Sequence, residues 1–152
     1  MTKQYAEQGM QKSVQNMGVG DTFVTKPRII TKTDLELYAI CTGDTHPLFL
    51  SEEAAKAAGW ENQLVPGLLT FSIAHGLLTQ AGFTKDVMAL MGTDNLRFNA
   101  TVYAYATIRV ETEVLSKRQT SQGRWVGTYS WVVKNQNDQV VAEGENHWML
   151  RA

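Results

Sequence analysis

The spacing of apolar residues divides this chain into a helical first half and a strand-forming second half. The segment 67–80 is apolar around most of a helical circumference, which is typical of a buried helix. From residue 87 onward the period becomes two: Ile108, Val110 and Val114 alternate with polar residues. The pattern predicts an α+β domain in which a long antiparallel sheet wraps around the helix at 67–80.

Turn and capping residues set the expected bounds of the earlier elements. We expect a strand over 22–30 that Pro27 interrupts at a sheet edge or a bulge. Thr33 and Glu36 form a capping-box pattern, which predicts a helix that begins there and ends at Gly43.

The same signals continue further along the chain. Ser51 is expected to cap a short helix that ends before Gly59, a residue suited to the left-handed position after it. The strand at 125–133 should pack one face, including Trp125 and Trp131, against the core. The polar turn at 135–138 leads into a last strand, which completes an antiparallel meander.

The chain of 152 residues fits one domain, because residues 18–152 show no linker or internal repeat. Residues 1–17 are polar and contain four glutamines, so we expect a mobile or loosely docked arm there. Cys41 is the single cysteine, which excludes an intramolecular disulfide, and we expect it to be a small buried group on a helix.

Charge and hydropathy exclude several classes of function. The formal net charge is −1, with 14 basic and 15 acidic residues, so neither nucleic acid nor an anionic membrane is an expected partner. The chain begins without the apolar core of a secretory signal and has no apolar run of about 18 residues, so a cytoplasmic location is expected.

Two segments carry candidate chemistry. Residues 43–50 place Asp44 and His46 two positions apart in a turn, and residues 64–69 lead into the apolar helix at Gly67. A carboxylate and an imidazole can exchange protons, and the N–H groups at a helix start can stabilise a developing oxyanion. The pair therefore predicts an active site.

The order and spacing of four segments resemble the MaoC-like, or R-specific enoyl-CoA hydratase, family of the hot-dog fold. They are residues 19–23, 42–47, 65–69 and 96–98, the last of which resembles the start of the family's second long strand. The resemblance implies a hot-dog domain that hydrates or dehydrates acyl thioesters in fatty acid metabolism.

The catalytic loop departs from the family pattern, which reads Asp, any residue, Asn, Pro, any residue, His. Asp44 and Pro47 match, whereas His46 stands in place of Asn and Phe49 in place of the catalytic His. Pro47 favours an extended residue before it, so Asp44 and His46 can project to one side and share a water. The alternative is that His46 only hydrogen-bonds the loop and the protein is a poor enzyme or a non-catalytic partner.

The resemblance also implies the remaining site residues. Pro66 replaces the family's usual His, but the oxyanion role needs only the N–H of Gly67. Phe49, Pro66 and Leu68 are expected to contact the substrate. Arg97 is a candidate for a CoA phosphate or pantetheine, with a surface ion pair as its alternative.

Other residues are assigned more ordinary roles. His75 lies too far along the helix from Gly67 to share its reacting centre, so it is expected to be buried or at an interface. His147 is expected to be a solvated cross-strand partner, and no metal site is expected. The family's Gly-Asp pair falls in a stretch that reads Tyr-Ala-Tyr-Ala here, at 103–106.

These observations lead to one main hypothesis and two alternatives. The chain is expected to interconvert a 2-enoyl thioester of CoA or acyl-carrier protein and its 3-hydroxyacyl thioester, as a homodimer without a cofactor. The first alternative is a non-catalytic acyl-thioester-binding or heteromeric subunit whose partner supplies the missing His. The second and least favoured is a thioesterase.

Overall fold

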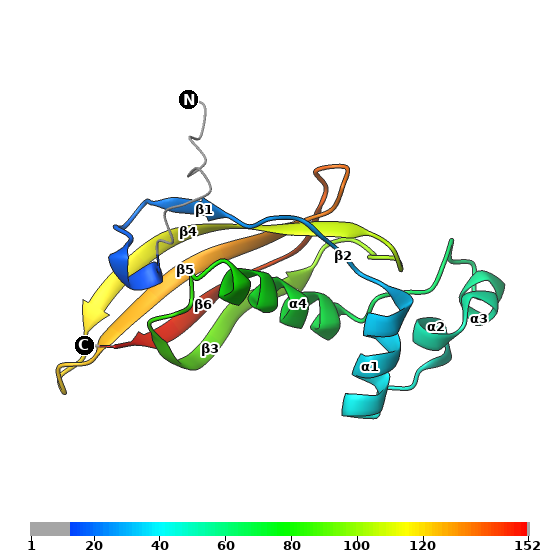
Figure 1. Ribbon diagram of the computed structural model, residues 1–152, viewed down its shortest axis with the longest axis horizontal. Helices are drawn as coiled ribbons and strands as arrows, with labels where there is room; N and C mark the ends of the chain where they lie inside the picture. Colours follow the sequence, from blue (N-terminus) through cyan, green and yellow to red (C-terminus); the bar gives the residue numbers. More distant parts are fainter. Residues whose placement is uncertain (1–12, 152) are drawn as a thin grey trace.

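The computed structural model describes residues 13–151. Its elements, in chain order, are η1 (Val14–Asn16), β1 (Thr22–Val24), β2 (Arg28–Ile29), α1 (Lys32–Thr42), α2 (Pro47–Leu50), α3 (Glu52–Ala57), α4 (Gly67–Gln80), β3 (Val87–Phe98), β4 (Thr107–Gln119), β5 (Trp125–Lys134) and β6 (Val140–Leu150). The sheet curves along α4, whereas α1, α2 and α3 lie beyond one end of that helix (Figure 1).

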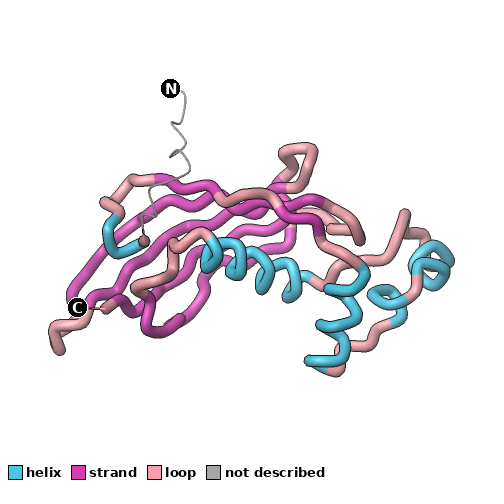
Figure 2. The backbone as a smooth tube through the Cα atoms, in the orientation of Figure 1, coloured by secondary structure: helices cyan, strands magenta, loops and turns pink. Residues whose placement is uncertain are grey.

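The sheet is antiparallel and follows the order β1-β4-β5-β6-β3, with β2 also paired to β4. The expected meander is confirmed for β4, β5 and β6, and the gap at Pro27 between β1 and β2 is confirmed too. Strand β3 crosses to the far edge beside β6, as the tube in Figure 2 shows. Residues 96–98 end β3, so their expected place at a strand start is wrong.

Helix α4 has the predicted bounds and packs on the sheet. Its buried residues include Leu69, Ile73 and Leu78, and they join a core built from the inner faces of β4, β5 and β6. Burying one such side chain contributes about 1.5–3 kcal/mol, so this layer provides much of the folding free energy. Trp131 is 1% exposed as expected, but Trp125 is 40% exposed because it is the first residue of β5.

A buried amide connects α4 to the sheet. The Asn146 Oδ1 atom accepts hydrogen bonds from Trp131 Nε1 at 3.0 Å and Thr93 Oγ1 at 2.6 Å. Its Nδ2 atom donates to the Tyr129 hydroxyl at 2.9 Å and contacts His75 Nε2. Asn146 is 0% exposed, so these four partners satisfy a side chain that water cannot reach.

Some of the predicted helix ends are confirmed and one is wrong. The capping box is Thr31 with Asp34 rather than Thr33 with Glu36, because Asp34 also pairs with Arg28 at 2.6 Å. The end of α1 at Gly43, where φ is 76°, is confirmed, as is the Ser51 cap of α3.

Two expectations about packing are corrected. Ser13, Val14 and Met17 are buried, and the Val14 N–H donates to the Phe83 carbonyl at 2.8 Å, so residues 13–17 are not a loose arm. Residues 1–12 of the expected arm lie outside the described residues. Cys41 is exposed, because it lies on a face of α1 that no other element of residues 13–151 covers.

None of the helices in residues 13–151 has the length and apolar character needed to cross a bilayer.

Candidate active site

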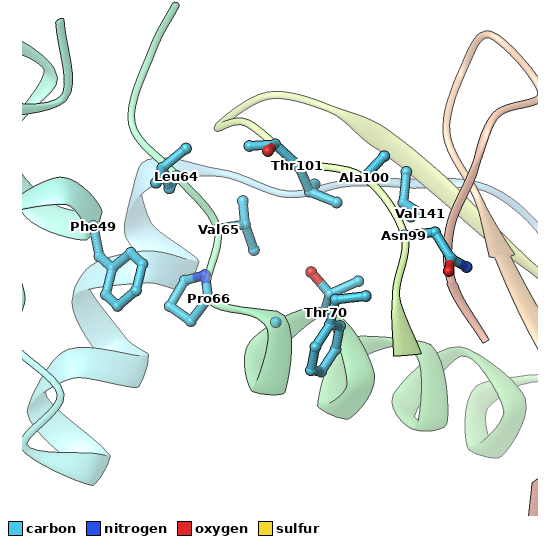
Figure 3. A pocket seen from close by; sticks show the side chains of 12 residues that line it. Phe49, Leu64, Val65, Pro66, Thr70, Asn99, Ala100, Thr101 and Val141 are labelled. Atoms are coloured by element: carbon cyan, nitrogen blue, oxygen red, sulfur yellow. The ribbon is translucent and has the colours of Figure 1, made fainter. Parts of the chain in front are cut away.

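A cavity of about 340 Å³ lies at the N-terminus of α4. Its walls come from α2, the segment before α4, the first turn of α4 and the chain after β3 (Figure 3). The residues that line it are Phe49, Leu64, Val65, Pro66, Gly67, Thr70, Phe98, Asn99, Ala100, Thr101, Val102 and Val141. The helix start identified from the sequence therefore borders a cavity.

Gly67 is the first residue of α4, and Pro66 is its N-cap. Pro66 has no side chain that could accept a hydrogen bond from the first turn. The N–H groups of that turn have no intrahelical acceptor, and the positive end of the helix dipole lies beside the cavity. This end of the cavity is suited to partial negative charge on a ligand oxygen.

Close packing accounts for the glycine at position 67. A β-carbon there would lie 2.9 Å from three ring atoms of Phe98, which is far too close. The Phe98 side chain is 48% exposed and also lines the cavity. Gly67 thus allows an aromatic ring to cover the backbone of the helix start.

Phe49, the residue that the sequence resemblance aligns with the family's catalytic His, lines the cavity. Two hydrogen bonds hold its helix against the segment before α4: Leu64 N–H donates to the Leu48 carbonyl at 3.0 Å, and Gln63 Nε2 donates to the Phe49 carbonyl at 3.1 Å. Gln63 is only 5% exposed, which fixes this attachment. A side chain at position 49 is therefore presented to the cavity by a well-anchored turn.

Asp44 and His46 lie in the loop between α1 and α2 and are exposed. They do not line the cavity of the single chain. The backbone of His46 is extended, with φ −58° and ψ 132°, as Pro47 predicts. Its Nδ1 atom accepts a hydrogen bond from the Leu48 N–H at 3.3 Å and so caps α2. His46 Nε2 makes no hydrogen bond within residues 13–151.

The charge of Asp44 reaches its neighbour Tyr38. Burial raises the pKa of the Tyr38 hydroxyl, and the Asp44 carboxylate raises it further.

The other expected substrate contacts differ in their placement. Pro66 lines the cavity, whereas Leu68 is 56% exposed and is not among the residues that line it. Arg97 is exposed on β3, opposite Glu143 of β6 in the strand register, and is not part of the cavity wall. Phe49, Pro66 and Gly67 are thus the expected residues that the fold brings together here.

Three polar residues of the cavity were not singled out from the sequence: Thr70, Asn99 and Thr101. Thr70 could have been found, because residues i and i+3 share a helix face and Gly67 was already a candidate. Asn99 and Thr101 lie in an irregular segment after β3, where the sequence pattern carries no spatial information.

The two remaining histidines lie outside the cavity. His75 is partly buried; its Nδ1 atom is 2.7 Å from the Phe71 carbonyl, and burial lowers the pKa of its imidazole. His147 is a cross-strand partner, as predicted, with Nδ1 2.8 Å from Thr128 Oγ1 and Nε2 2.6 Å from Asp94 Oδ2.

Two curated relatives carry names of dehydratases. The chain is 31% identical over 127 residues to a mitochondrial 3-hydroxyacyl-[acyl-carrier-protein] dehydratase of Arabidopsis thaliana, covering 84% of this chain and 74% of that protein. It is 32% identical over 139 residues to a beta-methylmalyl-CoA dehydratase of Chloroflexus aurantiacus. That match covers 90% of this chain but 39% of the longer relative.

Solved structures confirm the fold. A protein from Archaeoglobus fulgius described as a monoamine oxidase regulatory protein superposes with a TM-score of 0.82 at 26% identity, covering 99% of this chain and 98% of the other. A Mycobacterium tuberculosis protein with a double hot-dog fold gives a TM-score of 0.80 at 21% identity, covering 93% and 44%. The model of the MaoC like domain matches residues 14–136. The chain therefore belongs to the MaoC-like domain family and has the hot-dog fold.

Proposed function

We propose that this protein is a hydratase/dehydratase that interconverts 2-enoyl thioesters and 3-hydroxyacyl thioesters, carried on CoA or on acyl-carrier protein. The observation that carries the proposal is the cavity at the start of α4, which Gly67 lines as the first residue of the helix. Both curated relatives described above bear the names of dehydratases, one of an acyl-carrier-protein thioester and one of a CoA thioester.

The proposed reaction needs acid/base groups and an oxyanion donor, but no electron transfer. In the hydration direction, Asp44 orients a water and accepts its proton as the oxygen adds to C3. The electron pair of the double bond moves toward the thioester oxygen, where the Gly67 N–H stabilises the enolate. A proton then returns to C2, so water is added across the bond without a redox cofactor.

His46 is the proposed second polar group of the water site. Its Nδ1 atom caps α2, which leaves Nε2 for a water or substrate hydroxyl. In this arrangement His46 compensates in part for the family His, whose position is held by Phe49. Arg97 and Leu68 are proposed contacts for the CoA portion outside the cavity.

We propose that the working unit is a homodimer. Strand β3 lies at the edge of the sheet, and within residues 13–151 it pairs with β6 alone. An unpaired edge of this length is a ready surface for another strand. It exposes several large apolar side chains: Met88, Leu90, Met91, Leu96 and Phe98. A dimer would also supply a second loop with Asp44 and His46, which lie outside the cavity of one chain.

A second candidate function is favoured by Phe49. Because an aromatic ring stands in the cavity where the family has an imidazole, the chain also fits an acyl-thioester-binding or heteromeric subunit whose partner supplies the His. A thioesterase is the third candidate and would release free CoA.

The test is turnover of a panel of 2-enoyl-CoA thioesters by the wild type and three variants, followed by loss of the conjugated-thioester absorbance. Asp44→Asn should abolish hydration, and His46→Ala should lower it about 10²-fold, the scale of one general acid/base group. Asp21→Asn, a matched exposed carboxylate on the β1 side of the sheet, should leave it unchanged. Absence of wild-type turnover across the panel would favour the binding or heteromeric subunit.

A further inference from the structure

Thr70 carries a buried hydroxyl without a hydrogen-bond partner. Its side chain is 1% exposed, and Oγ1 neither donates nor accepts a hydrogen bond within residues 13–151. Four buried side-chain polar atoms of this part of the chain are in that state, and Thr70 Oγ1 is the one whose residue lines the cavity. A buried hydroxyl without a hydrogen-bond partner costs free energy, so a bound ligand that accepts its hydrogen bond would remove that cost.

The hydroxyl has an ordinary alternative that it does not use. Helical Ser and Thr side chains commonly donate to the carbonyl four residues earlier. Ser72 on the same helix donates to the Leu68 carbonyl at 2.8 Å, and Thr42 in α1 donates to the Tyr38 carbonyl at 2.7 Å. Thr70 makes no such bond to the Pro66 carbonyl, and its oxygen points into the space between the segment before α4 and the chain after β3 (Figure 3).

Thr70 lies on the same face of the helix as Gly67. Residues three apart on an α-helix are neighbours, separated by roughly 4.5 Å along the axis. Both residues line the cavity. The Gly67 N–H and the Thr70 hydroxyl can therefore converge on a single acceptor atom within it.

The other polar side chains of the cavity are less suited to that role. Asn99 Nδ2 already donates to Glu143 Oε2 at 3.0 Å, on the outer side of the strand. Thr101 is exposed at the cavity rim. Thr70 is thus the polar cavity residue whose side chain is buried and has no hydrogen-bond partner in residues 13–151.

We propose that the Thr70 hydroxyl donates a hydrogen bond to the carbonyl oxygen of the bound thioester, as a second oxyanion donor beside the Gly67 N–H. The inference rests on the proposed function, since it assigns a catalytic residue to the same thioester reaction. As the carbonyl becomes an enolate, its oxygen gains negative charge, and a donor held in a buried position stabilises that charge more than the ground state.

Matched variants test the hydroxyl. Thr70→Val removes it and keeps the shape, whereas Thr70→Ser keeps it. Thr70→Val should lower kcat for hydration of crotonyl-CoA by about 10–100-fold and raise KM by a smaller factor, about fivefold, and Thr70→Ser should stay within about threefold of the wild type. The melting temperature of Thr70→Val should not fall, because the hydroxyl has no partner in the fold. An equal loss of kcat in both variants, or no loss in Thr70→Val, would overturn the proposal.

A binding experiment separates this proposal from the proposed function. Calorimetry compares butyryl-CoA, which has the thioester carbonyl, with butyl-CoA, a thioether in which CH₂ replaces it. Thr70→Val should weaken butyryl-CoA about fivefold or more and leave butyl-CoA unchanged, the scale of one hydrogen bond. If the wild type binds butyryl-CoA but hydrates no enoyl-CoA, the hydratase assignment fails. The comparison of butyryl-CoA with butyl-CoA then still tests the contact between Thr70 and the carbonyl. Equal weakening of both ligands, unchanged binding of both, or no binding by the wild type would overturn the Thr70 assignment.

Discussion

The ring of Phe98 lies against Gly67, so that a β-carbon at position 67 would come within 2.9 Å of three ring atoms. One residue ends β3 and the other begins α4, and both line the cavity. The packing of the sheet edge is therefore tied directly to the helix start that would bind the thioester oxygen.

This contact predicts a coupled pair of mutations. Gly67→Ala should displace the Phe98 ring and lower kcat/KM at least tenfold. The free energy of unfolding should change by less than about 1 kcal/mol, because the ring is half exposed and alanine is a good helix former. Adding Phe98→Ala should restore part of the activity. Chemical denaturation and steady-state kinetics of both single variants and the double variant provide the cycle, and simple additivity would contradict the steric explanation.

Phe49→His should increase turnover. The side chain at position 49 faces the cavity and is anchored through Gln63, so an imidazole there would enter the site that the family His occupies. A positioned general acid/base contributes about 10²–10⁴-fold, and a gain of at least tenfold in kcat is expected. Phe49→Leu is the matched control and should show no gain. Equal rates for Phe49→His and wild type would contradict this prediction and would indicate that His46 provides the whole of this function.

The stability of the protein should depend on pH through His75. Burial lowers the pKa of this imidazole below its ordinary value of 6.5, partly offset by the hydrogen bond with the Phe71 carbonyl. The unfolded chain therefore takes up this proton first as the pH falls. The free energy of unfolding should drop below about pH 6.5, until the pH reaches the folded-state pKa. Urea denaturation between pH 8 and 5 should show a smaller drop for His75→Gln. Parallel curves for the two proteins would show that another group is responsible.

Tyr105 holds a conformation that suits glycine. Its φ is 70°, and its ring is 57% exposed beneath Lys32 Nζ, 5.9 Å from the ring centroid. A left-handed residue other than glycine costs roughly 1–2 kcal/mol, more than the entropy cost of glycine. Both Tyr105→Gly and Tyr105→Ala lose the ring, but only glycine relieves the strain. The free energy of unfolding of Tyr105→Gly should therefore exceed that of Tyr105→Ala by about 0.5–1 kcal/mol. The reverse order in thermal denaturation would contradict the strain argument.

Elements with a strong local pattern could be predicted from the sequence. Helix α4 is apolar around most of its circumference and begins after Pro66, so its bounds follow from local signals alone. The alternation in β4 likewise predicts which side chains are buried, from Ile108 to Val114. The pairing of β3 with β6 could not be predicted, because strand order depends on contacts between distant residues.

The capping error has a specific physical origin. Two overlapping patterns, Thr31 with Asp34 and Thr33 with Glu36, both match a capping box. The contact of Asp34 with Arg28, six residues earlier and in β2, favours the first of them. Local sequence alone does not contain that information.

The site was predicted as two segments, but the side chains of its inner wall were not. Phe49, Pro66 and Gly67 could be placed from motif spacing. Thr70 stands in an apolar helix, where a threonine is most simply read as core packing. Only the three-dimensional structure shows that this residue lines the cavity and that its buried hydroxyl has no hydrogen-bond partner in residues 13–151.

The most direct test of the account is the fate of labelled water. The purified protein is incubated with crotonyl-CoA in H₂¹⁸O, and the products are analysed by mass spectrometry. The account predicts 3-hydroxybutyryl-CoA with ¹⁸O on C3 and the thioester intact, and no label incorporation with Asp44→Asn. Release of free CoA with ¹⁸O in the carboxylate, or unchanged crotonyl-CoA, would contradict it.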